Sequence, residues 1–289
     1  MRLPARLRPL AIAAVLASWP AIPAGAQIPS DVTPDDPYGN FPFILPLVIT
    51  DRIFTFREEI EAEIREKVSF DAAYGGERVP VYLFLPSQTP PPYQTVIYFP
   101  TSNPLFVSSS EGIESYWEFP MFLSFLVRSG RALLFPIYQG TFERMDPAIT
   151  ANLYEAEANS RAYVEYLVQL VKDFRRCVDY LETRPEIDSR KLAFYGVSWG
   201  GVMATILSAV EERLAASVVV AGGLDPWPYR PEAHPINYVT RVRVPTLMLN
   251  GKYDWTLPQQ TTSQPMFDLL GTPPEHKRII FYDTDHVPL

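Results

Sequence analysis

Short apolar runs alternate with helical patterns along most of the chain. The runs are five to seven residues long and stand at 95–99, 132–138, 191–195, 216–220, 246–250 and 278–282. Apolar residues at helical spacing occupy most of the intervals, at 116–129, 154–183, 201–213 and 265–270. A strand that is apolar along its whole length must be covered on both faces, as in a parallel sheet between two layers of helices. We therefore expect an α/β fold with a mostly parallel central sheet and helices on both faces.

Two more strands are expected ahead of this pattern. Residues 67–74 and 79–85 favour strands, and the two glycines between them are typical of a hairpin turn. Beyond residue 50 the sequence has no segment with the composition of a linker and no internal repeat. Residues 67–289 are therefore predicted to form a single domain.

The N-terminus has the three parts of an export signal in order. Three arginines lie within the first eight residues, residues 10–19 are apolar, and residues 24–26 form an A-x-A cleavage motif. The apolar stretch is too short to span a bilayer. We expect a signal peptide over 1–26, cleaved after residue 26, and a secreted or periplasmic protein; the alternative is a basic tail. An extended arm and a helix are expected over 27–66.

Composition excludes several classes of function. The net charge is −8 and no basic run follows the first few residues, so neither nucleic acid nor an anionic membrane is an expected partner. A hydrophobic content of 47% is enough for a large packed core. Cys177 is the single cysteine, so no intramolecular disulfide can form, and we expect it to be buried rather than catalytic.

One serine stands in a glycine-rich turn between an expected strand and an expected helix. Gly196, Ser198 and Gly200 form a G-x-S-x-G pattern there. Such a sharp turn exposes the serine hydroxyl above the carboxyl edge of the sheet, where ligands bind. The N–H of Trp199 would then point toward a developing oxyanion at the start of the helix. The alternative is a turn whose glycines serve packing alone.

A nucleophilic serine needs a base, and the chain has three histidines. His234 precedes any acid in a suitable place, and His276 precedes the last strand, at the wrong edge of the sheet. His286 follows that strand, at the expected catalytic edge, and fits the chain order serine, acid, histidine. The alternative for His286 is an ordinary surface histidine.

The acid is expected after a strand between the serine and the histidine. Asp254 lies in a turn four residues past the strand 246–250, where its carboxylate could orient His286. Asp225 also follows a strand and is the rival. Asp283 and Asp285 are too close in sequence to His286 to orient its ring.

The stretches VIYFP, SGRALLFPIYQGTFER, FYGVSWGG and VPTLMLNGKYD carry a resemblance that covers residues 67–289. The chain resembles the α/β-hydrolase superfamily, within it the dienelactone-hydrolase and acetyl-xylan-esterase-like group, and especially the hydrolase module attached to some bacterial Ser/Thr protein kinases. The resemblance implies an α/β-hydrolase fold with Ser198 as nucleophile, Asp254 as acid and His286 as base.

The sequence departs from the superfamily pattern at two points. Many members have a His-Gly or glycine-rich turn that supplies the second oxyanion N–H, whereas residues 100–103 of this chain are Pro-Thr-Ser-Asn. By position, the N–H of Ser102 is the expected donor, with Thr101 next. Members also usually continue with a helix after the histidine, so either the N-terminal arm covers that face or the sequence is a shortened version.

Aromatic residues on the expected carboxyl-edge loops favour an aromatic-walled substrate pocket. The expected lining residues are Thr101, Phe106, Tyr138, Trp199, Trp227, Tyr229 and Trp255, and the segment 225–238 is the one most expected to line the pocket. No metal-binding or nucleotide-binding motif is present, so neither a metal nor another cofactor is expected. These features predict an exported serine hydrolase that forms an acyl-enzyme with a small-molecule or polymer-linked ester. A prolyl-oligopeptidase-like peptidase and a non-catalytic binding module of the same fold are the alternatives.

Overall fold

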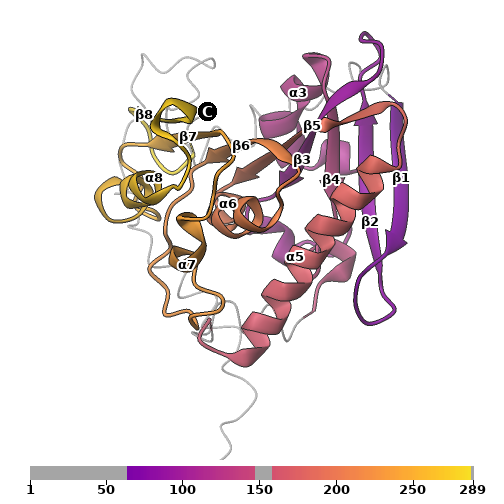
Figure 1. The fold of residues 1–289 in the computed structure, drawn as a ribbon. Helices are drawn as coiled ribbons and strands as arrows, with labels where there is room; N and C mark the ends of the chain where they lie inside the picture. Colours follow the sequence, from indigo (N-terminus) through magenta and orange to yellow (C-terminus); the bar gives the residue numbers. More distant parts are fainter. Residues whose placement is uncertain (1–63, 147–157, 288–289) are drawn as a thin grey trace, which may run out of the picture. The chain divides into compact units, whose positions relative to one another are not determined.

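The computed structural model describes residues 64–146 and 158–287. Its centre is an eight-stranded sheet in the order β1-β2-β4-β3-β5-β6-β7-β8 (Figure 1). The strands are β1 (Ile64–Asp71), β2 (Arg78–Leu85), β3 (Tyr93–Phe99), β4 (Ala132–Pro136), β5 (Ile187–Val197), β6 (Leu214–Val220), β7 (Thr246–Gly251) and β8 (Lys277–Tyr282). Only the pairings of β2 with β1 and with β4 are antiparallel. The predicted mostly parallel sheet and the predicted hairpin are confirmed.

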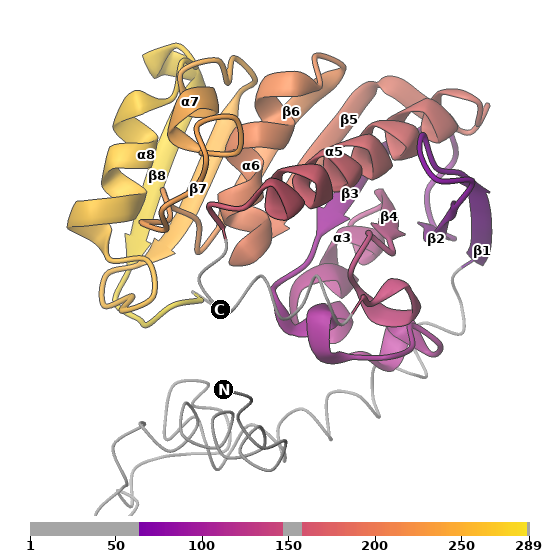
Figure 2. The ribbon, with the colours of Figure 1, turned by 90° about the horizontal axis from the view of Figure 1, so that it is seen from below.

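Helices cover the sheet on both faces, and the two faces have separate cores. The helices are α3 (Ser124–Arg128), α5 (Arg161–Glu182), α6 (Trp199–Val210), α7 (Ile236–Val239) and α8 (Gln264–Leu269). Alternate residues of β2 belong to different cores, Leu83 to the α5 and α6 side and Tyr82 to the α3 side. Figure 2 shows α3 on the opposite side of the sheet from α5 and α6. The inner strands β3, β4 and β6 are thus apolar on both faces because both are covered, whereas the edge strand β1 alternates between exposed and half-buried residues.

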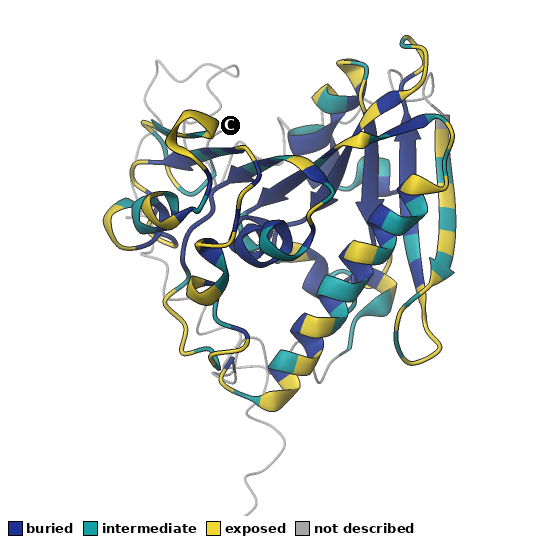
Figure 3. Cartoon of the chain, in the orientation of Figure 1, coloured by how far each residue is buried: buried dark blue, intermediate teal, exposed yellow. Residues whose placement is uncertain are grey.

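The long helix α5 shows how the pattern of apolar residues decides burial. Its buried residues recur at intervals of three and four, and Figure 3 shows the resulting stripe facing the sheet. Cys177 lies in this stripe, as expected, and burial raises the pKa of its thiol. Ser160 caps the helix by accepting the N–H of Tyr163 at 3.0 Å. The prediction that this helix includes residues 158–160 is wrong, since the cap lies there.

Several predictions concern residues outside the described ranges. They are the export signal over 1–26, the arm, most of the helix expected over 54–66, and the first residues of the helix expected from 154. The last three residues of the range 54–66 belong to β1, so the prediction of a helix is wrong there. Across the described ranges, none of the helices combines the length and apolar character needed to cross a membrane.

A buried ion pair joins the hairpin, the end of β4 and α5. Arg144 donates to the fully buried carboxylate of Asp173, 2.6 Å away, and to the hydroxyl of Tyr74. The same carboxylate accepts the hydroxyl of Tyr74 at 2.8 Å and the backbone N–H of Gln139 at 2.9 Å. Each oxygen is therefore satisfied, which a buried charge requires.

Removing Asp173 leaves the buried guanidinium of Arg144 with a single, half-exposed counterion, Glu77, at 3.3 Å. We expect Asp173→Ala to lower the free energy of unfolding by about 3–5 kcal/mol. The matched control is Asp179→Ala on the same helix, because Asp179 is partly exposed and pairs with Arg176 and Arg213 at the surface. That change is expected to cost less than about 1 kcal/mol. Urea unfolding followed by tryptophan fluorescence measures both, and equal effects would contradict the prediction.

Candidate active site

Ser198 stands in a strained turn between β5 and α6. Its φ is 57°, in the left-handed region that a serine occupies only when its surroundings demand it. Two backbone hydrogen bonds hold the turn, from Ser198 N–H to the carbonyl of Val220 at 2.9 Å and from Gly200 N–H to the carbonyl of Pro100 at 3.0 Å. The turn is thus fastened to the ends of both strands that flank β5.

The flanking glycines allow the backbone to approach this closely. A Cβ on Gly196 would lie 2.3 Å from the carbonyl oxygen of Gly200, and a Cβ on Gly200 would lie 2.3 Å from the carbonyl oxygen of Phe99. Both distances are far inside van der Waals contact with backbone atoms that cannot move aside. The glycines therefore serve packing, and the same packing places the Ser198 side chain at the carboxyl edge.

Three of the expected site residues form one hydrogen-bonded chain. The Oγ of Ser198 lies 2.8 Å from Nε2 of His286, and Nδ1 of His286 lies 2.7 Å from Oδ2 of Asp254. A carboxylate only accepts, so the ring hydrogen lies on Nδ1 and the lone pair of Nε2 faces the serine hydroxyl. This is the arrangement that general-base activation of a serine requires.

Asp254 is held on its other side by the backbone. Its side chain is fully buried, and Oδ1 accepts the N–H groups of Thr256 and Leu257, both at 2.8 Å. The turn that carries Asp254 also packs against the loop that carries His286, where a Cβ on Gly251 would lie 1.7 Å from the carbonyl oxygen of Asp285. The two loops therefore fix the acid and the base as one unit.

The other candidates for acid and base lie elsewhere. His276 precedes β8 at the opposite edge, as expected, and Nδ1 of His234 accepts the N–H of Ile236 at 3.3 Å. Asp225 contacts no histidine nitrogen in the described residues; its carboxylate accepts from Trp227 and Tyr229. The geometry therefore favours Asp254 over Asp225 as the partner of His286.

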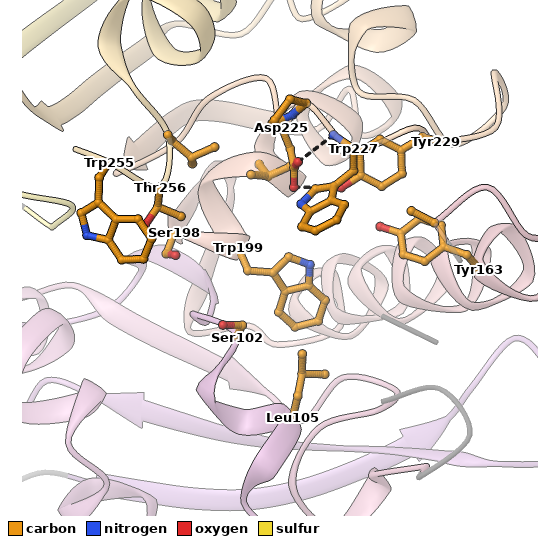
Figure 4. Close-up of a pocket in the computed structure, with 14 residues that line it drawn as sticks. Ser102, Leu105, Tyr163, Ser198, Trp199, Asp225, Trp227, Tyr229, Trp255 and Thr256 are labelled. Carbon is orange, nitrogen blue, oxygen red and sulfur yellow. Dashed lines mark hydrogen bonds between the residues drawn. The ribbon is translucent and has the colours of Figure 1, made fainter. Parts of the chain in front are cut away.

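A cavity of about 440 Å³ opens beside Ser198 (Figure 4). Among the expected site residues, Ser102, Trp199, Trp227, Tyr229 and Trp255 line it. Trp199 begins α6, so its N–H has no carbonyl one turn earlier in the helix to donate to. Ser102 begins the short 3-10 helix Asn103–Phe106 and faces the same cavity. The two expected oxyanion donors thus belong to residues that line the same cavity as Ser198.

Three expected lining residues do not line the cavity. Tyr138 is fully buried in the core, where its ring stacks on Phe99 and its hydroxyl donates to the carbonyl of Tyr98. Phe106 is 58% exposed but lies outside the cavity lining. Thr101 is buried and its hydroxyl donates to Glu118. For Tyr138 the prediction of a substrate contact is wrong, because the residue after a strand can point inward as well as outward.

Other lining residues were not expected from the sequence. They are Leu105, Ala158, Tyr163, Val202, Thr256 and Leu257. Asp225 and Pro226 also line the cavity and belong to the segment 225–238, which was expected there. Tyr163 comes from the first turn of α5, whose position over the carboxyl edge depends on where that helix begins. Recognising Ser160 as the N-cap would have placed Tyr163 in the first turn of the helix.

Glu118 holds the loop that carries Ser102 through a hydrogen bond from the hydroxyl of Thr101. No sequence motif identifies Glu118 as part of the site. Its fully buried carboxylate accepts hydroxyls from Tyr98 at 2.8 Å, from Tyr116 at 3.2 Å and from Thr101. Burial raises the pKa of Glu118 to about 7 even though these donors favour the charged form. A loop without glycine is thus held in place by side-chain hydrogen bonds.

Within residues 64–146 and 158–287, no group of three or more His, Cys, Asp or Glu side chains could hold a metal ion. The arrangement instead joins a serine hydroxyl, an imidazole and a carboxylate in one hydrogen-bonded chain, beside a cavity that Ser198, Trp199 and Ser102 line. That set suffices for acyl transfer without a cofactor.

Comparison with known proteins places the chain among hydrolases. Residues 124–287 match the Dienelactone hydrolase family. The protein named "Putative hydrolase YtaP" from Bacillus subtilis (strain 168) is 25% identical over 178 residues, which cover 58% of this chain and 56% of that protein. The chain therefore spans little more than half the length of this relative.

Solved structures share the fold at low identity. An acetyl xylan esterase from Paenibacillus sp. R4 has a TM-score of 0.57 at 19% identity, with 84% of this chain and 89% of the esterase covered. The Pyrococcus horikoshii acylaminoacyl peptidase has a TM-score of 0.56 at 11% identity, with 81% of this chain and 39% of the peptidase covered. At these identities the likeness concerns the fold alone.

Glu118 makes the stability of the site depend on pH. Its folded-state pKa of about 7 lies above the ordinary value of 4.5, so the folded chain binds this proton more tightly than the unfolded chain. The resulting stabilisation is complete below pH 4.5 and is lost as the pH rises through about 7. Glu118→Gln removes this titration, so the stability of the variant relative to the wild type is expected to rise by about 3 kcal/mol from acid to alkaline pH.

Urea unfolding at a series of pH values measures this difference. The matched control is Glu111→Gln, at an exposed position a few residues earlier, which is expected to show no such trend. A difference between Glu118→Gln and wild type that stays constant with pH would contradict the assignment.

Proposed function

The chain belongs to the dienelactone hydrolase family, and we propose that it cleaves carboxylic esters with Ser198 as the nucleophile of a Ser-His-Asp triad. The observation that supports this most strongly is the hydrogen-bonded chain from Ser198 through His286 to Asp254, with distances of 2.8 Å and 2.7 Å. It lies at the carboxyl edge of the sheet and opens onto a cavity large enough for a small ester.

The first half of the proposed reaction forms an acyl-enzyme. The Oγ of Ser198 attacks the ester carbonyl while Nε2 of His286 takes the hydroxyl proton. Asp254 keeps the imidazole in the required tautomer and stabilises the imidazolium that forms. The C–O bond to the alcohol then breaks, and His286 returns the proton to the leaving oxygen.

The negative charge on the carbonyl oxygen needs donors that are already in place. The N–H of Trp199 at the start of α6 and the N–H of Ser102 are proposed to supply them. The positive end of α6 adds to the stabilisation. Glu118 contributes indirectly, since its hydrogen bond to Thr101 holds the residue before Ser102.

The second half of the reaction releases the acyl group. Water takes the place of the alcohol, and His286 accepts its proton as the water attacks the acyl carbon. Collapse of the second tetrahedral intermediate breaks the bond to Ser198 Oγ and returns the proton to it. The carboxylic acid leaves and the free enzyme is restored.

Replacement of the triad residues tests the proposal directly. We expect Ser198→Ala to lower kcat on p-nitrophenyl acetate by about 10⁴-fold or more and to abolish labelling by a fluorophosphonate probe. Asp254→Asn is expected to lower kcat by about 10⁴-fold, because an amide would turn His286 to the wrong tautomer.

The matched control for Asp254 is Asp283→Asn, since Asp283 lies on the exposed loop after β8 and pairs with Lys252. We expect wild-type turnover from it. Full activity of Ser198→Ala would rule out this mechanism. A wild-type protein that is folded but neither labelled nor active on esters would favour a non-catalytic module. Turnover of aminoacyl nitroanilides without ester cleavage would favour a peptidase.

The role of the Ser102 N–H has its own test. Ser102 has φ −75°, which proline can adopt, so Ser102→Pro deletes the N–H while matching that angle. We expect kcat to fall by about 100- to 1000-fold with little change in KM. Ser102→Ala keeps the N–H and is the matched comparison. Equal activities of the two variants would assign the second donor to another residue.

A further inference from the structure

The cavity has a second polar feature, away from Ser198. Figure 4 shows Asp225 with Trp227, Tyr229 and Tyr163 on one side of the Trp199 ring, and Ser198 with Trp255 on the other. Asp225 follows β6, the strand between those that precede Ser198 and Asp254. The proposed reaction gives this group of residues no part.

The carboxylate of Asp225 is a negative charge with neutral partners. Oδ1 accepts the backbone N–H of Trp227 at 3.0 Å, and Oδ2 accepts the hydroxyl of Tyr229 at 3.0 Å. Burial raises the pKa of Asp225, although both donors favour the charged form. Among the residues that the structure describes, no Lys or Arg pairs with it. The His234 ring also favours the charged form of Asp225, but no ion pair joins the two side chains. The charge is therefore desolvated in part and has no Lys or Arg as its counterion.

Aromatic rings surround the space next to this carboxylate. Tyr163 and Tyr229 lie with their ring centroids 5.4 Å apart, and Trp199 and Trp227 contribute two further rings to the lining. The faces of such rings carry partial negative charge and attract cations, most strongly organic ammonium groups. The ring centroid of His234 lies 5.6 Å from that of Tyr229, and His234 does not line the cavity.

We infer that this end of the cavity binds the ammonium group of a cationic ester, with Asp225 as the counterion and the rings as its cage. The inference rests on the proposed function, because it concerns the substrate of the same site. A neutral polyol would bind there more weakly than a cation, because each oxygen of Asp225 already accepts a hydrogen bond from the protein. The hydrogen-bond donors to Asp225 are neutral, so a cationic ligand would add the ionic interaction that they do not provide.

Binding without turnover provides the first test. Choline and 3,3-dimethylbutan-1-ol have the same shape and differ in charge, and both can be titrated into the Ser198→Ala variant by calorimetry. We expect choline to bind at least about tenfold more tightly. Adding Asp225→Asn is expected to remove this preference, because the amide loses the charge. Its oxygen can still accept the N–H of Trp227, and its NH2 can donate to the hydroxyl oxygen of Tyr229.

The matched control is Glu232→Gln, on the same segment. Glu232 is an exposed carboxylate that pairs with Arg230 and does not line the cavity, so the change removes one negative charge from the same region. We expect the preference for choline to survive in this variant. Equal affinities for the two alcohols, or a preference that Asp225→Asn leaves unchanged, would overturn the inference.

Turnover separates this inference from the proposed function. The ratio of kcat/KM for acetylcholine to that for 3,3-dimethylbutyl acetate is expected to exceed about ten in the wild type and to fall toward one in Asp225→Asn. Hydrolysis of both acetates at equal rates would overturn the inference and leave the esterase proposal standing. Binding of choline that depends on Asp225, with neither acetate hydrolysed, would support the inference and count against the esterase proposal.

Discussion

The close packing of backbone at Gly196 and Gly200 is the constraint on which the site depends. Because neither residue has a Cβ, the turn can close tightly and approach the end of β3. It also bonds to the ends of β3 and β6, through the carbonyls of Pro100 and Val220. That double attachment holds Ser198 at a positive φ that its side chain disfavours. The same geometry starts α6 at Trp199. The direction of the hydroxyl and the position of the first helical N–H therefore have one cause.

The sequence was sufficient to predict how the ends of the strands come together. Apolar runs on both faces required a covered parallel sheet, and parallel strands bring their carboxyl ends to one edge. Ser198, Asp254 and His286 follow β5, β7 and β8, which lie in that order with β6 between the first two. The order of these residues along the chain was therefore enough to predict that they lie at one edge of the sheet. Their proximity could be expected without knowing the conformations of the loops.

The direction of individual side chains was harder to predict, for a physical reason. Beyond the last ladder residue, the alternation of strand faces no longer fixes where a side chain points. Tyr138 follows β4 yet turns into the core, while Asp225 follows β6 and turns into the cavity. The burial of Glu118 could not be predicted from the sequence either, because a carboxylate does not fit the apolar pattern of a buried segment. Its burial is explained by the hydroxyls of Tyr98 and Thr101, which donate hydrogen bonds to it.

Asp225 and Asp254 lie at the same edge of the sheet, but their carboxylates have different hydrogen-bond partners. Asp254 is fully buried, with one oxygen occupied by two backbone N–H groups and the other by His286, so its charge is matched by an imidazole that can become cationic. Asp225 has only neutral donors and borders open space lined by rings. The first charge is already committed to a partner within the protein. The second remains available to a ligand. This difference in partners, rather than the residue type, is why we propose that Asp254 orients the imidazole and that Asp225 recognises the substrate.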